Sequence, residues 1–133
     1  MRVLIVEDNP LLGFLIETSL ADVGHDPLGP VPTVDSALDI LQSTTPDLAF
    51  VDINLDGEQS GLVLGNAFND RGIPFFYASG QLAIARSAAA PAMGLIPKPF
   101  SPELLVGVVN AVEGYRDGNL NVSFPPEVEI FVK

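Results

Sequence analysis

Short apolar runs that alternate with helix-like segments constrain the fold of this chain more than any other feature. Apolar runs of strand length occur at residues 3–6, 48–51, 75–78 and 95–96. Segments with apolar residues three or four positions apart, as in amphipathic helices, occur at residues 10–23, 34–41, 62–68, 81–90 and 102–115. Because the strand-like runs are apolar throughout rather than alternating, they fit strands buried on both faces. The pattern predicts an α/β protein with a parallel sheet covered by helices.

The stretch after the first predicted helix fixes the order of the strands. Residues 26–32 read DPLGPVP, and the three prolines cannot donate hydrogen bonds to a neighbouring strand. This strand therefore belongs at an edge, which the order 2-1-3-4-5 provides. We predict a flavodoxin-like (βα)5 three-layer sandwich with a five-stranded parallel sheet over residues 1–117. Helix starts are predicted at Asn9-Pro10, Thr33 and Ser101-Pro102, where a capping side chain precedes the apolar periodicity.

Residues 118–133 lie beyond this predicted domain. Val128, Ile130 and Val132 alternate with Glu129, Phe131 and Lys133, as in a strand, and Pro125-Pro126 separates them from the last helix. Two interpretations stay open for this C-terminal extension. It either adds a short strand to a sheet edge, or it is flexible. It is too short and not basic enough to be a DNA-binding module.

Composition excludes several classes of function. The chain has 133 residues, no cysteine and one histidine, His25, which rules out disulfides, thiolate catalysis and a multi-histidine metal centre. Six basic and 17 acidic residues give a net charge of −11, so we expect no nucleic-acid partner. No apolar run reaches the about 20 residues that a membrane span needs, and the N-terminus does not resemble a signal peptide. We expect a cytoplasmic protein without a membrane partner.

Three carboxylates end two predicted neighbouring strands. Glu7 and Asp8 follow the first strand and Asp52 ends the third, and these strands are adjacent in the predicted order. Acids placed together at a buried sheet edge either take up protons or recruit a cation, and hard carboxylate oxygens suit Mg²⁺. The alternative for Glu7 and Asp8 alone is that they favour the start of the following helix. Helix capping does not require the third acid, Asp52.

Two further polar residues end strands at the same edge. Lys98 follows the fifth strand, where its ammonium group can offset the acids and contact a phosphoryl oxygen. Ser79 ends the fourth strand and offers a hydroxyl to the same space. The alternative for Lys98 is an ordinary surface lysine, which we favour less, and Ser79 taken alone is most often a turn residue.

The chain resembles the receiver domain of two-component response regulators in its combination of Glu7-Asp8, Asp52, Ser79 and Lys98-Pro99. The spacing from Asp8 to Asp52 and the asparagine at position 54 are also typical of that family. The resemblance implies that Asp52 accepts a phosphoryl group from a histidine kinase or a histidine phosphotransfer protein. It implies that Asp8, Asp52 and the Asn54 main-chain carbonyl bind Mg²⁺, with Glu7 acting mostly through water. Lys98 would pair with the phosphoryl group, and Ser79 would move to hydrogen-bond it.

The resemblance also implies the kind of output. Such a domain catalyses only its own phosphorylation and dephosphorylation, and it acts through contacts with a downstream protein or as a phosphate sink. The alternative is a pseudo-receiver, an interaction module that never transfers phosphate. A haloacid-dehalogenase-type phosphatase is disfavoured because Asn54 stands where its second acid would be. A flavodoxin-like cofactor binder is disfavoured because no phosphate-cradling loop follows the first strand.

The sequence departs from the usual pattern of the family at several positions. Position 95 is leucine, where receivers usually carry an aromatic residue that swings inward on activation. The stretch PFFYASG at 74–80 resembles a subgroup of stand-alone receivers with the pattern Pro-Phe-x-Phe-Ala-Thr/Ser-Gly. Tyr77 and Gln81 differ from the usual residues of that subgroup. The alanine-rich segment 81–91, on the family's docking surface, is either a mobile helix or plain buried packing.

Overall fold

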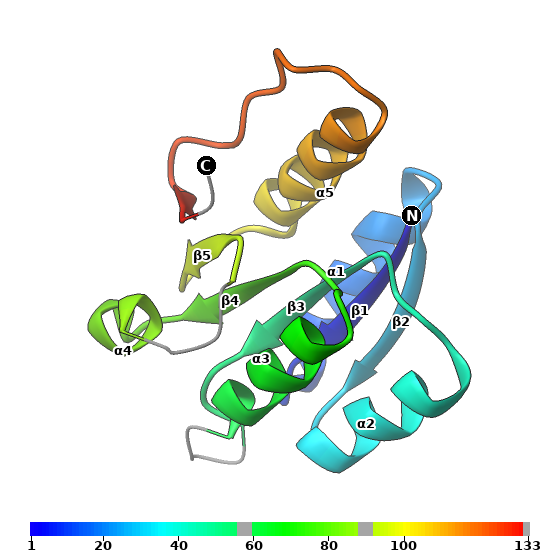
Figure 1. Ribbon diagram of the computed structural model, residues 1–133, viewed down its shortest axis with the longest axis vertical. Helices are drawn as coiled ribbons and strands as arrows, with labels where there is room; N and C mark the ends of the chain where they lie inside the picture. The colour runs from blue at the N-terminus through cyan, green and yellow to red at the C-terminus, as the bar shows by residue number, and fades with distance from the viewer. Residues whose placement is uncertain (56–59, 88–91, 132–133) are drawn as a thin grey trace.

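A six-stranded sheet forms the centre of the protein in a computed structural model that describes residues 1–55, 60–87 and 92–131. The strands lie in the order β2-β1-β3-β4-β5-β6 (Figure 1). Their bounds are β1 Arg2–Val6, β2 Asp26–Val31, β3 Leu48–Asp52, β4 Phe75–Ser79, β5 Gly94–Pro97 and β6 Glu129–Ile130. The first five pair in parallel, and β6 is antiparallel to β5.

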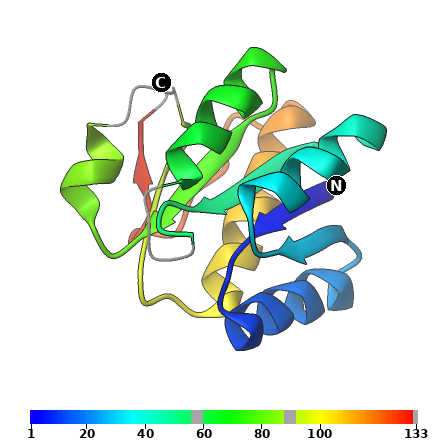
Figure 2. The same cartoon turned by 90° about the horizontal axis from the view of Figure 1, so that it is seen from below.

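Helices cover both faces of the sheet. Seen from below, α1 and α5 lie on one side of the strands and α2 and α3 on the other, with α4 beyond β4 at the far end (Figure 2). The helix bounds are α1 Pro10–Asp22, α2 Val34–Ser43, α3 Gly61–Asp70, α4 Leu82–Arg86 and α5 Pro102–Arg116. None of the helices in the described ranges combines the length and the apolar character that crossing a bilayer requires.

Strand alternation divides the core between the two layers of helices. Val3 and Ile5 of β1 belong to the cluster that includes residues of α1 and α5, whereas Leu4 and Val6 belong to the cluster that includes residues of α2 and α3. Both sets are essentially fully buried. Since successive strand residues point to opposite faces, a strand buried on both sides must be apolar at every position. This is why the runs read as continuous rather than alternating.

The strand order confirms the prediction for the first five strands, but the predicted number of strands is wrong. The proline-bearing β2 lies at one edge, paired only with β1 among the described strands. At the other edge the chain adds β6, so the sheet has six strands and is not wholly parallel. The alternating pattern around residues 128–132 suggested such an added strand as one of two alternatives, and β6 lies within that pattern.

The predicted helix starts are confirmed. The Asn9 side chain accepts a hydrogen bond from the Leu12 N–H at 3.1 Å, and the Ser101 hydroxyl accepts one from the Leu104 N–H at 3.3 Å. Thr33 and Ser36 cap α2 reciprocally. In each case the side chain satisfies a backbone donor that the first helical turn leaves free. The predicted helix at 81–90 is described only as α4, since residues 88–90, like Val132, lie outside the described residues.

Candidate functional site: an acidic cluster at the carboxyl edge of the sheet

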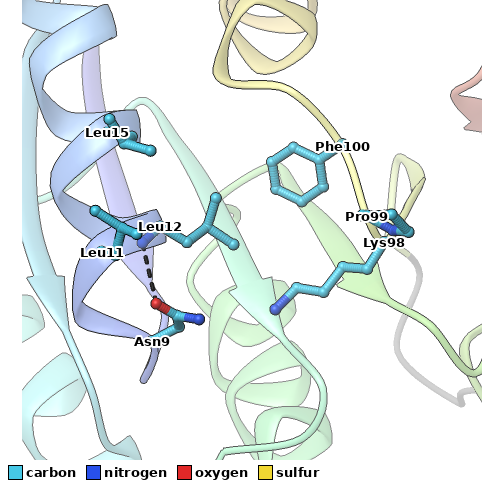
Figure 3. Close-up of a pocket in the computed structure, with 7 residues that line it drawn as sticks. All are labelled: Asn9, Leu11, Leu12, Leu15, Lys98, Pro99 and Phe100. Atoms are coloured by element: carbon cyan, nitrogen blue, oxygen red, sulfur yellow. Dashed lines mark hydrogen bonds between the residues drawn. The ribbon is translucent and has the colours of Figure 1, made fainter.

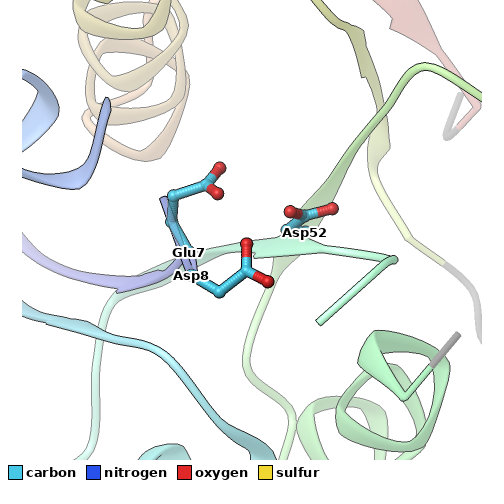
Figure 4. Close-up of side chains that lie close together, drawn as sticks. All are labelled: Glu7, Asp8 and Asp52. Atoms are coloured by element: carbon cyan, nitrogen blue, oxygen red, sulfur yellow. The ribbon is translucent and has the colours of Figure 1, made fainter. Parts of the chain in front are cut away.

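Glu7, Asp8 and Asp52 converge where β1 and β3 end. One carboxylate oxygen from each lies within 4.8 Å of the other two. Figure 4 shows the three side chains gathered above the ends of these two strands. Glu7 and Asp52 are buried, with 5% and 6% of their surface exposed, whereas Asp8 is half-buried. The structure therefore brings together the three acids that the sequence singled out.

The register of the sheet places these acids side by side. Val6 of β1 lies opposite Val51 of β3, so the next residues, Glu7 and Asp52, leave the sheet at the same level. The Asn9 N–H donates to Glu7 Oε2 at 3.1 Å, and the Asn54 N–H donates to Asp52 Oδ1 at 3.0 Å. Each of these two carboxylates is thus oriented by a backbone amide two residues further on.

Lys98 lies between two of the acids. Its Nζ donates to Glu7 Oε1 at 2.8 Å and to Asp52 Oδ2 at 3.0 Å. The Lys98 N–H donates to the Ser79 carbonyl oxygen at 2.9 Å, which fixes the lysine backbone beside the end of β4. The Lys98–Pro99 peptide bond is cis. One ammonium group thus faces a cluster of three carboxylates.

Burial and charge shift the ionisation of this cluster. Burial raises the pKa of the Glu7 carboxyl above its ordinary value, and the nearby Asp52 charge adds to this, although the Lys98 contact opposes it. Burial alone would lower the pKa of Lys98, but its hydrogen bonds to Glu7 and Asp52 outweigh burial, and the pKa is raised. The lysine therefore stays charged, and Glu7 holds its proton more tightly than a free glutamate does.

Ser79 and Asn54 lie on a second side of the cluster and are connected by Gln81. The buried Ser79 hydroxyl accepts a hydrogen bond from the Gln81 N–H at 2.8 Å. The Gln81 side-chain oxygen accepts one from Asn54 Nδ2 at 3.3 Å. Gln81 was noted in the sequence only as a departure from a subgroup pattern, and its link between Ser79 and Asn54 was missed. Its place two residues after a serine at a strand end is a recognisable turn signal.

Gly61, at the start of α3, is a further residue that sequence reasoning missed. A Cβ at this position would overlap the Asp52 carbonyl oxygen and crowd the Ile53 Cα. The Gly61 N–H donates to the Ile53 carbonyl oxygen at 3.0 Å. Only glycine lets α3 approach the end of β3 so closely. Nothing in the sequence marks it, because the constraint comes from a backbone segment packed against it.

The donor set fits a hard divalent cation. Three carboxylates carry more negative charge than the Lys98 ammonium offsets, and carboxylate oxygens are the ligands that Mg²⁺ takes in proteins. Burial is the main cause of the raised pKa of Glu7, with a smaller contribution from the Asp52 charge, and a bound cation would offset both by favouring the charged carboxylates. The residues present therefore suit magnesium, as receiver domains generally require.

Two grooves flank the cluster on either side of α1. One, of about 470 Å³, is lined by the first turns of α1 and by residues 98–100, and Figure 3 shows Leu12 and Phe100 bordering it. The other, of about 360 Å³, is lined by both acids of the β1 end together with Pro10, Phe14 and Glu17. Leu11 and Phe14 are 68% and 59% exposed. The solvent-facing side of α1 next to the cluster is therefore apolar.

Comparison with known proteins identifies the class that this fold and site define. The profile of the family described as "Response regulator receiver domain" matches residues 3–110. The chain belongs to this family. Receiver domains are components of two-component signalling systems and are not conventional enzymes.

Individual relatives agree with this assignment. The chain is 31% identical over 116 residues to the phyllosphere-induced regulator PhyR of Methylorubrum extorquens, covering 82% of this chain and 42% of that protein. It is 29% identical over 138 residues to the transcriptional regulatory protein PhoP of Escherichia coli O157:H7, covering 95% of this chain and 59% of that protein. The chain thus spans about half the length of these relatives.

Solved structures show the same fold. The receiver domain of NtrX from Brucella abortus is 31% identical, with a TM-score of 0.73 over 81% of this chain and 94% of that chain. The chemotaxis response regulator CheY4 of Vibrio cholerae is 22% identical, with a TM-score of 0.73 over 84% of this chain and 97% of that chain, and it supports the fold alone.

Proposed function

We propose that this chain is a phospho-accepting receiver whose Asp52 carboxylate takes a phosphoryl group in a magnesium-dependent reaction. The observation that carries the proposal is the placement of Asp52. Its Oδ1 accepts from the Asn54 N–H and its Oδ2 accepts from Lys98 Nζ, so a buried nucleophile is held in one orientation beside a cation. Positioning and charge neutralisation supply most of the catalysis in phosphoryl transfer.

Metal binding belongs to the same proposal. Asp8, Asp52 and the Asn54 main-chain carbonyl would hold Mg²⁺, with Glu7 acting through water. When bound, the ion neutralises charge on the transferring phosphoryl group and on the attacking carboxylate. The chain's own part is to hold the Asp52 carboxylate in place, and Lys98 contributes a second positive charge at 3.0 Å from its oxygen.

Ser79 and Lys98 have roles after the transfer. A phosphoryl group on Asp52 adds negative charge next to Lys98 Nζ, which already contacts that carboxylate. The Ser79 hydroxyl would turn to donate to a phosphoryl oxygen, and its hydrogen bond from the Gln81 N–H would then weaken. Phosphorylation of Asp52 would thus change a hydrogen bond of Gln81, the residue just before α4. This change does not require an aromatic residue at position 95.

We propose a histidine kinase or a histidine phosphotransfer protein as the phosphodonor. The apolar, exposed Leu11, Phe14 and Leu15 lie on α1, immediately after Asp8 and beside the grooves that border the acidic cluster. Exposed apolar patches of this kind favour contact with a protein surface.

We propose that the output is a contact with a downstream protein, or that the domain acts as a phosphate sink. A net charge of −11 disfavours a nucleic-acid partner. We assign the receiver to residues 1–117 and a C-terminal extension to residues 118–133.

The test is phosphorylation by a small donor. The protein is incubated with acetyl phosphate and Mg²⁺, and its intact mass is followed over time. We expect one acid-labile phosphoryl adduct that decays slowly at neutral pH, and none when Mg²⁺ is chelated or when Asp52→Asn is used. Asp39→Asn, which changes an exposed acid on α2, should label like the unchanged protein.

Two outcomes would contradict the proposal. Undiminished labelling of Asp52→Asn would place the acceptor elsewhere. Absence of any adduct with acetyl phosphate and with a histidine phosphotransfer protein would favour the pseudo-receiver alternative, an interaction module without phosphotransfer.

A further inference from the structure

The chain does not stop at α5 but returns to the sheet. Residues 119–131, which we call the return segment, run from the end of α5 towards β5 and finish there as β6 (Figure 1). β6 pairs antiparallel with β5, with Leu95 opposite Glu129 and Gly94 opposite Ile130. The Phe131 N–H donates to the Met93 carbonyl oxygen at 2.8 Å. The return segment therefore covers a sheet edge that would otherwise present free backbone groups.

Glycines in the body of the protein leave room for this segment. A Cβ on Gly94 would overlap the Glu129 carbonyl oxygen, a Cβ on Gly107 would lie 3.2 Å from Pro125 Cγ, and a Cβ on Gly114 would lie 2.9 Å from Val122 Cγ1. Gly107 and Gly114 lie within α5, where glycine weakens a helix by about 1 kcal/mol relative to alanine. Close packing of the return segment explains why glycine stands at each of these three positions.

The segment also inserts apolar side chains. Val128 is buried in the cluster formed with α1 and α5 residues, and the Phe124 ring lies 6.2 Å from the Phe76 ring, centroid to centroid. Apolar anchors combined with main-chain pairing are what an extended peptide uses to bind a sheet edge.

An exposed ion pair also holds the end of the return segment. Arg86 of α4 binds Glu129 in a bidentate manner, with Nε 3.0 Å from each carboxylate oxygen and Nη2 2.8 Å from Oε2. The two side chains are 52% and 38% exposed. β6 has two residues, of intermediate burial and exposed, whereas every residue of β3 and β4 is buried, so we expect β6 to open more readily than these core strands.

We propose that the β5 edge is a strand-docking site, and that the return segment is its resident occupant. The partner that fits is an extended segment of another protein that runs antiparallel to β5. It would carry an apolar side chain at the place of Val128 and a carboxylate facing Arg86. Arg86 is one of only six basic residues on a chain of net charge −11, so it selects an acidic residue at this point. The partner binds by replacing the return segment, and this does not depend on phosphorylation of Asp52.

The test uses a labelled synthetic peptide with the sequence of residues 119–131 and the full-length chain. In the unchanged chain the resident segment competes at an effective concentration in the millimolar range, so binding is weak. Glu129→Arg in the chain weakens the resident segment and leaves Arg86 and Gly94 in place. We expect this variant to bind the peptide more tightly, by about three- to ten-fold, the range that an exposed ion pair and its reversal support.

A charge swap separates this site from nonspecific binding. A chain carrying Arg86→Glu should prefer a peptide with Glu129→Arg over the unchanged peptide, reversing the preference of the Glu129→Arg chain. Thermal melting of each variant, followed by far-ultraviolet circular dichroism, checks that the domain is folded. The proposal is overturned if folded Glu129→Arg binds the peptide no better than the unchanged chain, or if the preference does not follow the charge at position 86.

Discussion

At the scale of single residues, the contact of Lys98 with two buried carboxylates determines the stability of the acidic cluster. Replacing Lys98 with methionine removes the ammonium that lies 2.8 Å from Glu7 and 3.0 Å from Asp52. We expect a loss of about 1–3 kcal/mol in the free energy of unfolding at pH 7 without divalent cations, since breaking a buried pair leaves uncompensated charge. Urea denaturation measures this loss, and Arg71→Met, at an exposed position, should change it little.

The loss in Lys98→Met should depend on pH in a defined direction. The pKa of Glu7 is already raised by burial, and removing Lys98 raises it further. A carboxyl with a raised pKa in the folded state binds its proton more tightly than in the unfolded chain, so stability falls as pH rises through the window above 4.5. Lys98→Met should therefore be closer in stability to the unchanged protein at pH 5 than at pH 7. A larger deficit at pH 5 would contradict this assignment of charge.

Tyr77 offers a second test at this scale. Its side chain is 1% exposed, and among the described residues its hydroxyl has no hydrogen-bond partner. Burial raises the pKa of the phenol to about 12. Tyr77→Phe removes an unsatisfied polar group from the core, so we expect it to raise the free energy of unfolding by about 1 kcal/mol. A clear loss of stability in urea would show that the hydroxyl has a partner.

The ionisation of Tyr77 can be followed directly. Since its pKa rises from 10.0 to about 12 on folding, stability should decline as pH increases across that window, where the unfolded phenol loses its proton first. In a Tyr115→Phe chain Tyr77 is the one remaining tyrosine. Its tyrosinate absorbance should appear near pH 12 or with unfolding. Full ionisation of the folded protein near pH 10 would contradict the burial of the phenol.

The sequence predicted part of the site at this scale. Glu7, Asp8, Asp52 and Lys98 are charged residues at the ends of apolar strands, so their position alone suggested that they meet. Gln81 and Gly61 escaped prediction because their contacts with Ser79, Asn54 and the end of β3 arise only in the folded chain. The Gln81 N–H donates to the Ser79 hydroxyl, and Gly61 has no side chain that would overlap the Asp52 carbonyl oxygen.

At the scale of elements, the close approach of α3 to β3 supports the orientation of Asp52. Gly61→Ala would place a methyl group against the Asp52 carbonyl oxygen, so either α3 or the strand end must move. We expect a loss of about 2–4 kcal/mol in the free energy of unfolding, in the range of overpacked or strained sites. Gly80→Ala is the matched control, because its Cβ would meet no atom within 4 Å. Equal stability of the two variants would show that α3 adjusts without cost.

Elements were predictable where a local signal was strong. The prolines of β2 exclude it from the middle of the sheet, and Asn9, Thr33 and Ser101 mark helix starts by their side-chain chemistry. β6 was undecided because Gly94, Gly107 and Gly114, which accommodate the return segment, reveal their purpose only when the segment is seen against them. Its pairing depends on long-range contacts rather than on local pattern.

At the scale of the whole molecule, the net charge of −11 and the convergence of three acids predict stabilisation by magnesium. A cation that binds only the folded state adds about 1.4 kcal/mol at a tenfold excess over its dissociation constant. We expect Mg²⁺ to raise the melting temperature by a few degrees, and Asp8→Asn to remove most of this shift. Sodium chloride at equal ionic strength controls for general screening of the charge. An unchanged shift in Asp8→Asn would place the cation elsewhere.

The most direct measurement is the identity of the residue that carries the phosphoryl group. The protein is treated with acetyl phosphate and Mg²⁺, reduced with borohydride so that an aspartyl phosphate becomes homoserine, and digested for peptide mass mapping. We predict homoserine at position 52 and at no other acid, and none when Mg²⁺ is chelated. Homoserine at another acid, or an unmodified Asp52 in protein that has gained a phosphoryl adduct, would contradict the assignment of Asp52 as the acceptor.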